Sequence, residues 1–334
     1  MKIDINSHIC PLRYKEALNK VSGAPSIKYE LKLIEGCSTL YDVEKRLRIL
    51  DKYDCTQILT LISPPIEDVA KPKEALELAR IANDSMAELV YEHPEVFIGA
   101  VAALPLNDME ATLNEVDRAI NELKFRGVQI FTSIQGKPLD LPEFFPLYEK
   151  MVSYNLPIWL HPFRVLATPD YSTETESKYK IWSTFGWPYE TTAAMTRLIY
   201  SGVFERLPTL KIVTHHCGGM VPFFADRIRS GYDLIERVRL PGQPKQMLTR
   251  SPIEYYRMFY NDTAIAGCTP ALMCTYDFFG PEHILFGTDM PMDSQLGFRL
   301  VRQIIESIEQ MDIPDSDKKK IFEGNARSLL RLPI

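Results

Sequence analysis

Hydrophobic residues alternate along the chain between short, nearly continuous runs and longer stretches where they recur every three or four positions. The short runs are rich in β-branched residues, which is typical of parallel strands buried on both faces. They predict strands at residues 2–9, 57–63, 97–105, 127–133, 157–161, 210–216, 258–263 and 284–289. The longer stretches predict amphipathic helices, for example at residues 75–89, 113–123, 191–204 and 300–308.

Eight strands separated by helices predict an α/β fold, a distorted (β/α)8 TIM barrel that forms a single domain over residues 1–334. A doubly wound open sheet is the alternative, but no glycine-rich phosphate-binding turn follows the first predicted strand. Long insertions follow the first and fifth strands, at residues 11–40 and 162–188, on the face where barrel active sites are built. The second carries Trp182 and Trp187, which either cover an aromatic substrate or form a small aromatic core beneath the loop.

The composition is that of a globular protein with a mild net charge of -6. Opposite charges are interspersed, so neither a basic nucleic-acid surface nor a polybasic membrane anchor is expected. No apolar stretch approaches the roughly 20 residues that span a bilayer. The six cysteines are scattered without a Cys-x-x-Cys pair, as is typical of free thiols in a reducing compartment. We therefore predict a cytoplasmic protein that binds neither nucleic acid nor membrane.

Four of the six histidines fall at the carboxyl ends of predicted strands, and Asp289 ends the eighth strand. The four are His8, His161, His215 and His216. His93 and His283 instead precede strands and are expected to be surface or structural residues. Because the carboxyl ends of barrel strands meet at one mouth, the histidines that end three of these strands and the Asp289 carboxylate should converge. Neutral imidazole and carboxylate are the ligands of a catalytic divalent metal with an open position.

Two details bear on which metal binds here and on which histidines face it. Asn6 shares a face of the first strand with His8, and an amide oxygen suits Mn²⁺ or Mg²⁺ better than Zn²⁺. His215 and His216 are neighbours on one predicted strand, so only one of them is expected to face the mouth. A histidine close to a metal but not bound to it is suited to general acid or base catalysis.

The chain resembles the amidohydrolase-related family of aminocarboxymuconate-semialdehyde decarboxylase nearly from end to end. The matching motifs include MKIDINSH at residues 1–8, HP at 161–162, HCGG at 216–219, GTDMP at 287–291 and GNA at 324–326. The resemblance implies one divalent metal, with zinc favoured over manganese or magnesium, and no organic cofactor. It implies His8, His161 and Asp289 as metal ligands, with Asn6 at the position of the family's usual first histidine ligand. It also implies that His216 is the catalytic histidine, which leaves His215 facing away.

The same resemblance bears on the substrate and on assembly. Arg227 matches an arginine that binds a substrate carboxylate from the neighbouring subunit, which implies a homodimer or higher homo-oligomer. A second family arginine has no counterpart, because Ile34 or its neighbours stand there, and Arg46 and Arg48 fall on family positions within the next helix. A hydroxylated aromatic monoacid therefore fits better than a dicarboxylate.

The expected function is metal-dependent nonoxidative decarboxylation of a small aromatic or unsaturated carboxylic acid. His216 or Asp289 would deliver the proton, and Arg227, Trp182 and Trp187 would bind the substrate. A metal-dependent hydrolase of a lactone or amide is the first alternative, because one barrel supports many reactions. A catalytically silent binding protein that retained the pocket is the second, and Asn6 is its support.

Overall fold

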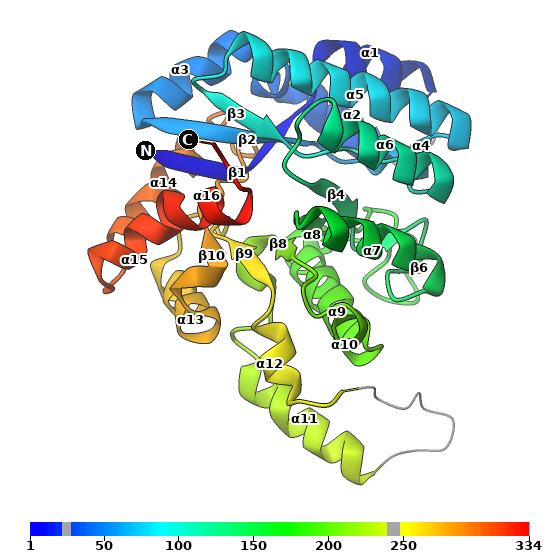
Figure 1. The fold of residues 1–334 in the computed structure, drawn as a ribbon, viewed down its shortest axis with the longest axis vertical. Coiled ribbons are helices and arrows are strands. Elements are labelled where there is room, and N and C mark those ends of the chain that lie inside the picture. Colours follow the sequence, from blue (N-terminus) through cyan, green and yellow to red (C-terminus); the bar gives the residue numbers. More distant parts are fainter. Residues whose placement is uncertain (22–27, 239–247, 334) are drawn as a thin grey trace.

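The computed structural model describes residues 1–21, 28–238 and 248–333, and it follows the predicted alternation of strands and helices (Figure 1). The main strands are β1 (Lys2–Ile9), β2 (Cys55–Leu61), β3 (Phe97–Ala100), β4 (Val128–Phe131), β7 (Ile158–His161), β8 (Ile212–Thr214), β9 (Tyr260–Asp262) and β10 (Ile284–Leu285). A small hairpin consists of β5 (Ser133–Ile134) and β6 (Lys137–Pro138). The last three main strands are shorter than predicted and end before the candidate site residues at 215, 216 and 289.

The helices lie between these strands along the chain. In the first half they are α1 (Leu12–Val21), α2 (Lys28–Gly36), α3 (Val43–Tyr53), α4 (Ile66–Val69), α5 (Pro72–Glu92), α6 (Met109–Asn121) and α7 (Phe145–Tyr154). In the second half they are α8 (Ile181–Thr184), α9 (Gly186–Tyr200), α10 (Val203–Arg206), α11 (Ala225–Arg237), α12 (Pro252–Tyr256), α13 (Thr269–Phe279), α14 (Phe298–Glu309), α15 (Asp315–Lys319) and α16 (Asn325–Leu329). Local signals explain several starts: Pro72 is in the first turn of α5, and the Asp108 carboxylate accepts from the Ala111 amide 3.1 Å away at the start of α6.

The main strands form two parallel sheets, with the orders β1-β2-β3 and β10-β9-β8-β7-β4. Backbone hydrogen bonds connect the two sheets. Next to β3, the Ala102 amide donates to the Gly127 carbonyl oxygen at 2.9 Å. At the other edge, the Ile5 amide of β1 donates to the Phe286 carbonyl oxygen at 2.9 Å. The prediction of an α/β fold with parallel strands is confirmed.

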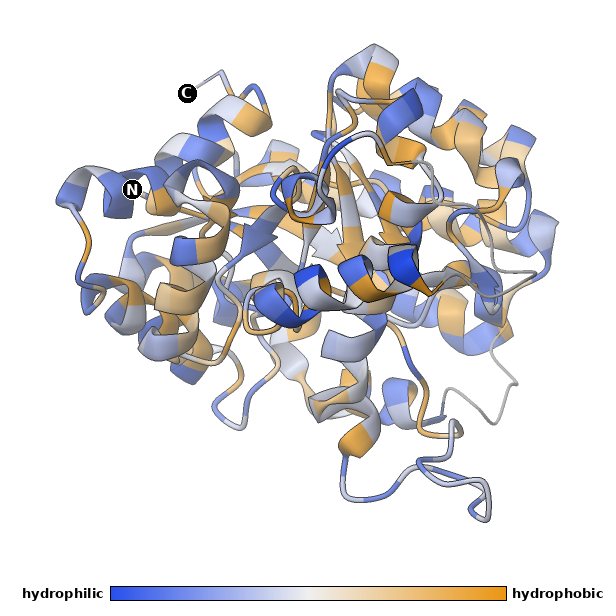
Figure 2. Ribbon diagram, turned by 90° about the horizontal axis from the view of Figure 1, so that it is seen from below, coloured by the Kyte–Doolittle hydropathy of each residue, from blue (hydrophilic) through white to orange (hydrophobic). Residues whose placement is uncertain are grey.

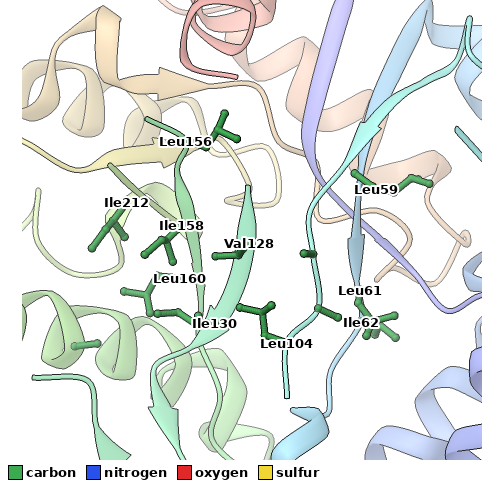
Figure 3. Packing of buried hydrophobic residues seen from close by; sticks show 14 of the residues in the cluster. Leu59, Leu61, Ile62, Leu104, Val128, Ile130, Leu156, Ile158, Leu160 and Ile212 are labelled. Carbon is green, nitrogen blue, oxygen red and sulfur yellow. The ribbon is translucent and has the colours of Figure 1, made fainter. Parts of the chain in front are cut away.

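Residues on opposite faces of the strands pack into two separate apolar clusters. The larger lies between strands and helices, and Figure 3 shows four of its members, Val128, Ile130, Ile158 and Leu160, on β4 and β7. The smaller draws on most of the strands and contains Ile3, Ile5, Ile58, Val101, Trp159, Val213 and Leu285. Hydrophobic and hydrophilic residues are mixed along the surrounding helices, as amphipathic helices require (Figure 2). We call the smaller cluster the inner cluster.

The two long segments after β1 and β7 fold differently. The first contains α1 and α2, apart from residues 22–27, which lie outside the described part. The second is largely irregular until α8. Figure 1 shows α11 and α12 extending away from the rest of the chain. Within the described ranges, no helix is long and apolar enough to cross a membrane.

Candidate active site

A cavity of about 450 Å³ lies where the chain leaves the carboxyl ends of β1, β7, β8 and β10. Its lining includes four of the residues singled out from the sequence, His8, His161, His216 and Asp289. These positions are far apart in the chain, and the strand ends bring them together as expected for parallel strands. A cavity of this volume is sufficient for a small organic substrate.

His161 presents a free lone pair to His8. The His161 Nδ1 lies 2.7 Å from the Pro162 carbonyl oxygen, and a carbonyl only accepts, so Nδ1 donates. In the neutral ring Nε2 then has the lone pair, and it lies 3.3 Å from the Nε2 of His8. Burial first, and then the neighbouring imidazoles, hold the pKa of His161 well below its usual range. A neutral imidazole with an exposed lone pair is the form that binds metals.

Asp289 lies between His8 and His216. Its Oδ1 is 3.1 Å from the His8 Nε2, and its Oδ2 is 3.8 Å from the His216 Nε2. Burial acts to raise the pKa of Asp289, but the hydrogen bonds and charges of both histidines outweigh it and hold that pKa well below the usual range. Burial likewise acts to lower the pKa of His216, and the Asp289 carboxylate outweighs it, so the pKa of His216 is raised.

His215 lies closer to the site than expected, although it does not line the cavity. Its ring lies 4.9 Å from that of His161 and is fully buried, while His216 lines the cavity beside it. The alternation of faces did not apply, because β8 ends at Thr214. His215 is still extended, but His216 adopts a left-handed backbone with φ of 55°, which turns both imidazoles toward the same region.

Asp262 was not among the predicted site residues, but its carboxylate accepts hydrogen bonds from several groups on this side of the site. Its Oδ2 accepts from the His215 Nδ1 at 2.7 Å and from the Asn6 Nδ2 at 2.8 Å. Its Oδ1 accepts from the backbone amides of His216 at 2.8 Å and Ala264 at 3.0 Å. A sequence signal existed, because Asp262 ends the seventh main strand as Asp289 follows the eighth.

Asn6 is buried beside these groups, and its two amide atoms differ in their contacts. Its amide nitrogen donates to Asp262, whereas its Oδ1 is buried without a hydrogen-bond partner among the described residues. Its role as a metal ligand stays a prediction.

Aromatic side chains form another part of the cavity wall. Trp182 and Trp187 both line the cavity, with ring centroids 5.6 Å apart in an edge-to-face arrangement. Trp182 also contacts Tyr29 of α2 at 5.2 Å, so the two long segments meet here. The two tryptophans thus line the cavity and also pack together. Both expectations for this segment, a cover for an aromatic substrate and a small aromatic core, are consistent with this arrangement.

The predicted arginines occupy different places. Arg227 is exposed on α11 and does not line the cavity of its own chain. Arg46 is buried in α3, where it donates to the His8 carbonyl oxygen and to Gln57 Oε1 at 2.7 Å, so it supports β1. Arg299 was not predicted as a site residue, but it lines the cavity from α14, and its buried Nε has no partner in the described structure. No motif marked Arg299, because it belongs to an ordinary amphipathic helix.

The donor set fits a divalent metal ion. Across residues 1–21, 28–238 and 248–333, no group of three or more His, Cys, Asp or Glu side chains is already assembled as a metal site. However, ligands about 2.1 Å from one ion lie roughly 3.0–3.4 Å apart. The separations of His8 Nε2 from His161 Nε2, 3.3 Å, and from Asp289 Oδ1, 3.1 Å, both agree with a shared ion. The unpartnered Oδ1 of Asn6 adds a further buried donor.

A family model described as amidohydrolase matches residues 51–332, so the chain belongs to the amidohydrolase family. The 2-amino-3-carboxymuconate-6-semialdehyde decarboxylase of Dictyostelium discoideum is 30% identical, over 99% of this chain and 92% of its own. The gamma-resorcylate decarboxylase of Polaromonas sp. strain JS666 is 31% identical, over 88% of this chain and 89% of its own.

Solved structures agree. The dihydroxybenzoic acid decarboxylase from Polaromonas sp. JS666, with bound manganese and the inhibitor 2-nitroresorcinol, is 27% identical with a TM-score of 0.80. The alignment covers 100% of this chain and 97% of that one. The predicted family and the predicted activity class, a nonoxidative carboxy-lyase, are confirmed by these relatives.

Proposed function

We propose that this protein is a divalent-metal-dependent decarboxylase of a small hydroxylated aromatic monocarboxylic acid. The observation that carries the proposal is the approach of His8, His161 and Asp289 to one another at a cavity walled by Trp182 and Trp187. Imidazole and carboxylate donors suit a metal, and flat indole rings suit an aromatic substrate. The manganese bound to the Polaromonas relative supports a divalent ion, and the preference for zinc stays a prediction.

We also infer a closed, distorted (β/α)8 barrel in a single domain. Hydrogen bonds between the two sheets at both edges support closure, as does the Trp159 Nε1 of β7, which donates to the Ile5 carbonyl oxygen of β1 at 3.0 Å. The inner cluster would fill such a barrel, because barrel interiors are packed by side chains from several strands. The segments after β1 and β7 would be insertions at its mouth.

The protein's own side chains account for most of the proposed mechanism. His8, His161 and Asp289 would hold the ion, and a bound divalent ion supplies Lewis-acid charge that orients the carboxylate and withdraws electron density. The indoles of Trp182 and Trp187 would hold the ring and exclude water. The bond to the carboxylate carbon breaks, its electron pair stays on the ring carbon, and CO2 leaves. His216 then gives that ring carbon a proton and recovers one from solvent, because Asp289 is engaged as a ligand.

The apolar residues at the position of the second family arginine favour a monoacid. Ile34, at the position where the family resemblance implies a second arginine, is buried and apolar, and its neighbour Leu33 lines the cavity. Arg299 and Lys180 are the basic residues of the described lining, and the unpartnered Nε of Arg299 would donate to the substrate carboxylate or to a ring hydroxyl. The relatives act on acids such as gamma-resorcylate and 6-methylsalicylic acid, which are hydroxylated benzoates with one carboxyl group.

We propose a homodimer in which Arg227 reaches the site of the partner. The support is the position of Arg227 on the projecting helix α11 together with exposed apolar side chains around it (Figure 1). Phe223, just before α11, is 80% exposed, and Leu234 within it is 60% exposed. Exposed apolar residues of this size on a projecting element favour contact with another protein surface. The cytoplasmic location stays a prediction.

The test is a substrate screen with purified protein loaded with Mn²⁺ or Zn²⁺. The panel contains 2,6-dihydroxybenzoate, 6-methylsalicylate, and a lactone and an amide without a free carboxylate. We expect CO2 release and the decarboxylated phenol from a hydroxybenzoate, measured by chromatography and by bicarbonate assay. Hydrolysis of the lactone or amide with no CO2 from any acid would overturn the proposal.

A further inference from the structure

His215 combines two features that the proposed mechanism does not use. Its Nδ1 lies 2.7 Å from the Asp262 Oδ2, and because a carboxylate accepts, this nitrogen bears the hydrogen. Its Nε2 therefore has the lone pair in the neutral ring. That nitrogen is buried and has no hydrogen-bond partner in the described part of the chain. Leaving a buried acceptor unpaired costs about 1–3 kcal/mol, so such an atom in a site points to a missing partner.

The surroundings of His215 indicate what the partner is. Its ring lies 4.9 Å from the ring of His161, whose Nε2 is 3.3 Å from the Nε2 of His8. The ring that has the unpartnered lone pair therefore lies beside His161, and His161 in turn lies next to His8. A carboxylate bonded to one ring nitrogen is the usual way in which a metal-bound histidine is oriented through the other.

Asn6 is connected to His215 through Asp262. Its amide nitrogen is bonded to the same carboxylate oxygen of Asp262 as His215, at 2.8 Å. One carboxylate therefore fixes both side chains. Position 6 provides no imidazole, whereas His215, held by the same carboxylate, does.

Resting on the proposed divalent metal, we infer that His215 binds the ion through Nε2 as its third imidazole ligand, in place of the histidine that position 6 lacks. Asn6 is then a positioning residue, which acts on His215 through Asp262. His216 is not a ligand, which leaves it free for proton transfer. The ligand set of three imidazoles and the Asp289 carboxylate is one that zinc and manganese both accept.

The experiment measures metal binding rather than turnover. Metal-free wild type and the variants His215→Ala, His215→Gln, Asn6→Ala and His216→Ala are titrated with Zn²⁺ and Mn²⁺ by competition with a chromophoric chelator. X-ray absorption spectra of the zinc-loaded proteins give the number of imidazoles bound. His215→Gln keeps a donor for Asp262, so it guards against loss of folding in the alanine variant. Circular dichroism confirms that each variant is folded.

We expect both His215 variants to weaken metal binding by about 100-fold or more and to lose one of three imidazoles. Asn6→Ala should keep three imidazoles and weaken binding by about tenfold, as expected for a residue that only orients a ligand. His216→Ala is the matched control and should keep both the affinity and the imidazole count. Added free imidazole should restore part of the affinity of His215→Ala.

Wild-type affinity and three imidazoles in folded His215→Gln would overturn the inference. So would a change in imidazole count in His216→Ala with none in the His215 variants. The proposed function fails separately, if wild type binds the metal through three imidazoles but releases no CO2 from any acid. Absence of stoichiometric metal binding by wild type would contradict both the inference about His215 and the proposed function.

Discussion

Trp187 stacks over His216, with the ring centroids 6.4 Å apart and the planes inclined by 23°. The same indole contacts the edge of His161 at 5.8 Å and donates from Nε1 to the Arg164 carbonyl oxygen at 3.2 Å. One side chain thus touches both a proposed metal ligand and the proposed proton donor, and it is itself held by the backbone.

Replacing this indole should affect binding and chemistry together. We expect Trp187→Leu to lower kcat/KM for an aromatic acid by about 10–100-fold, because a flat contact is lost and His216 is held less firmly. Trp187→Phe should retain more activity, since a ring remains. Steady-state kinetics on the hydroxybenzoate found in the screen measure the effect. An unchanged kcat/KM in the leucine variant would contradict this role.

Metal removal should abolish activity reversibly. After dialysis against a strong chelator we expect no CO2 release, and about one equivalent of Mn²⁺ or Zn²⁺ should restore it. His161→Ala should lose both metal content and activity. His93→Ala is the control, because His93 precedes β3 at the opposite end of the strands and should leave the metal content unchanged. Elemental analysis measures the metal content and the CO2 assay measures the activity. Full activity in metal-free protein would contradict a metal-dependent reaction.

Arg299 should contribute mainly to substrate binding. Loss of a charged hydrogen bond costs about 1.5–3 kcal/mol, so Arg299→Met should raise KM by about 10–100-fold with a smaller change in kcat. Arg299→Lys should recover part of this loss. The matched control is Arg302→Met, one turn further along α14, where the exposed side chain lies 3.9 Å from Glu306. Equal KM values for the Arg299→Met and Arg302→Met variants would remove Arg299 from the substrate site.

Complementation tests whether Arg227 acts across subunits. Arg227→Ala and His216→Ala should each be nearly inactive alone. In hybrid dimers one site regains both residues, so random exchange in an equal mixture should restore about a quarter of wild-type activity. Native mass spectrometry establishes the exchange independently. Hybrid dimers without recovered activity would show that Arg227 does not serve the partner's site.

Glu67 on α4 should make the protein less stable as pH rises. Burial raises its pKa from 4.5 to about 8, and its Oε1 has no hydrogen-bond partner among the described residues. Between these values the unfolded chain releases the proton and the folded chain retains it, so the free energy of unfolding falls as pH increases. Glu67→Gln should remove this contribution and become the more stable protein at pH 8 by at most about 5 kcal/mol.

Urea denaturation of both proteins at pH 5 and pH 8 measures this difference. At pH 5 the two should be similar, because wild-type Glu67 is then protonated and uncharged in the folded protein. A constant difference between wild type and variant across this pH range would mean that Glu67 titrates normally in the folded state.

The parallel strands and the meeting of His8, His161, His216 and Asp289 were accessible from the sequence, because buried strands leave a continuous apolar signal and their ends converge. The orientation of His215 was not, since the alternation of faces holds only within a strand and β8 ends at Thr214. The left-handed backbone of His216 is uncommon for residues other than glycine, and the sequence did not predict it at this position.

The other site residues that the sequence did not predict depend on contacts between positions far apart in the chain. Asp262 could have been noticed at the end of its strand, but its bonds to Asn6 and His215 join positions more than 45 residues apart in the chain. Arg299 has no motif, because its importance comes from where α14 lies relative to the cavity and not from its neighbours in sequence.

The inner cluster determines how the reactants must travel. Ile5, Trp159, Val213 and Leu285 precede the site residues on β1, β7, β8 and β10, and all four are fully buried. These side chains beneath the proposed metal are therefore apolar. In the proposed closed barrel, the acid that enters and both products that leave would share the mouth of the cavity between the tryptophans and α14. CO2 and the phenol would have to depart before the next acid binds, so their release through this mouth would compete directly with the reverse reaction, carboxylation.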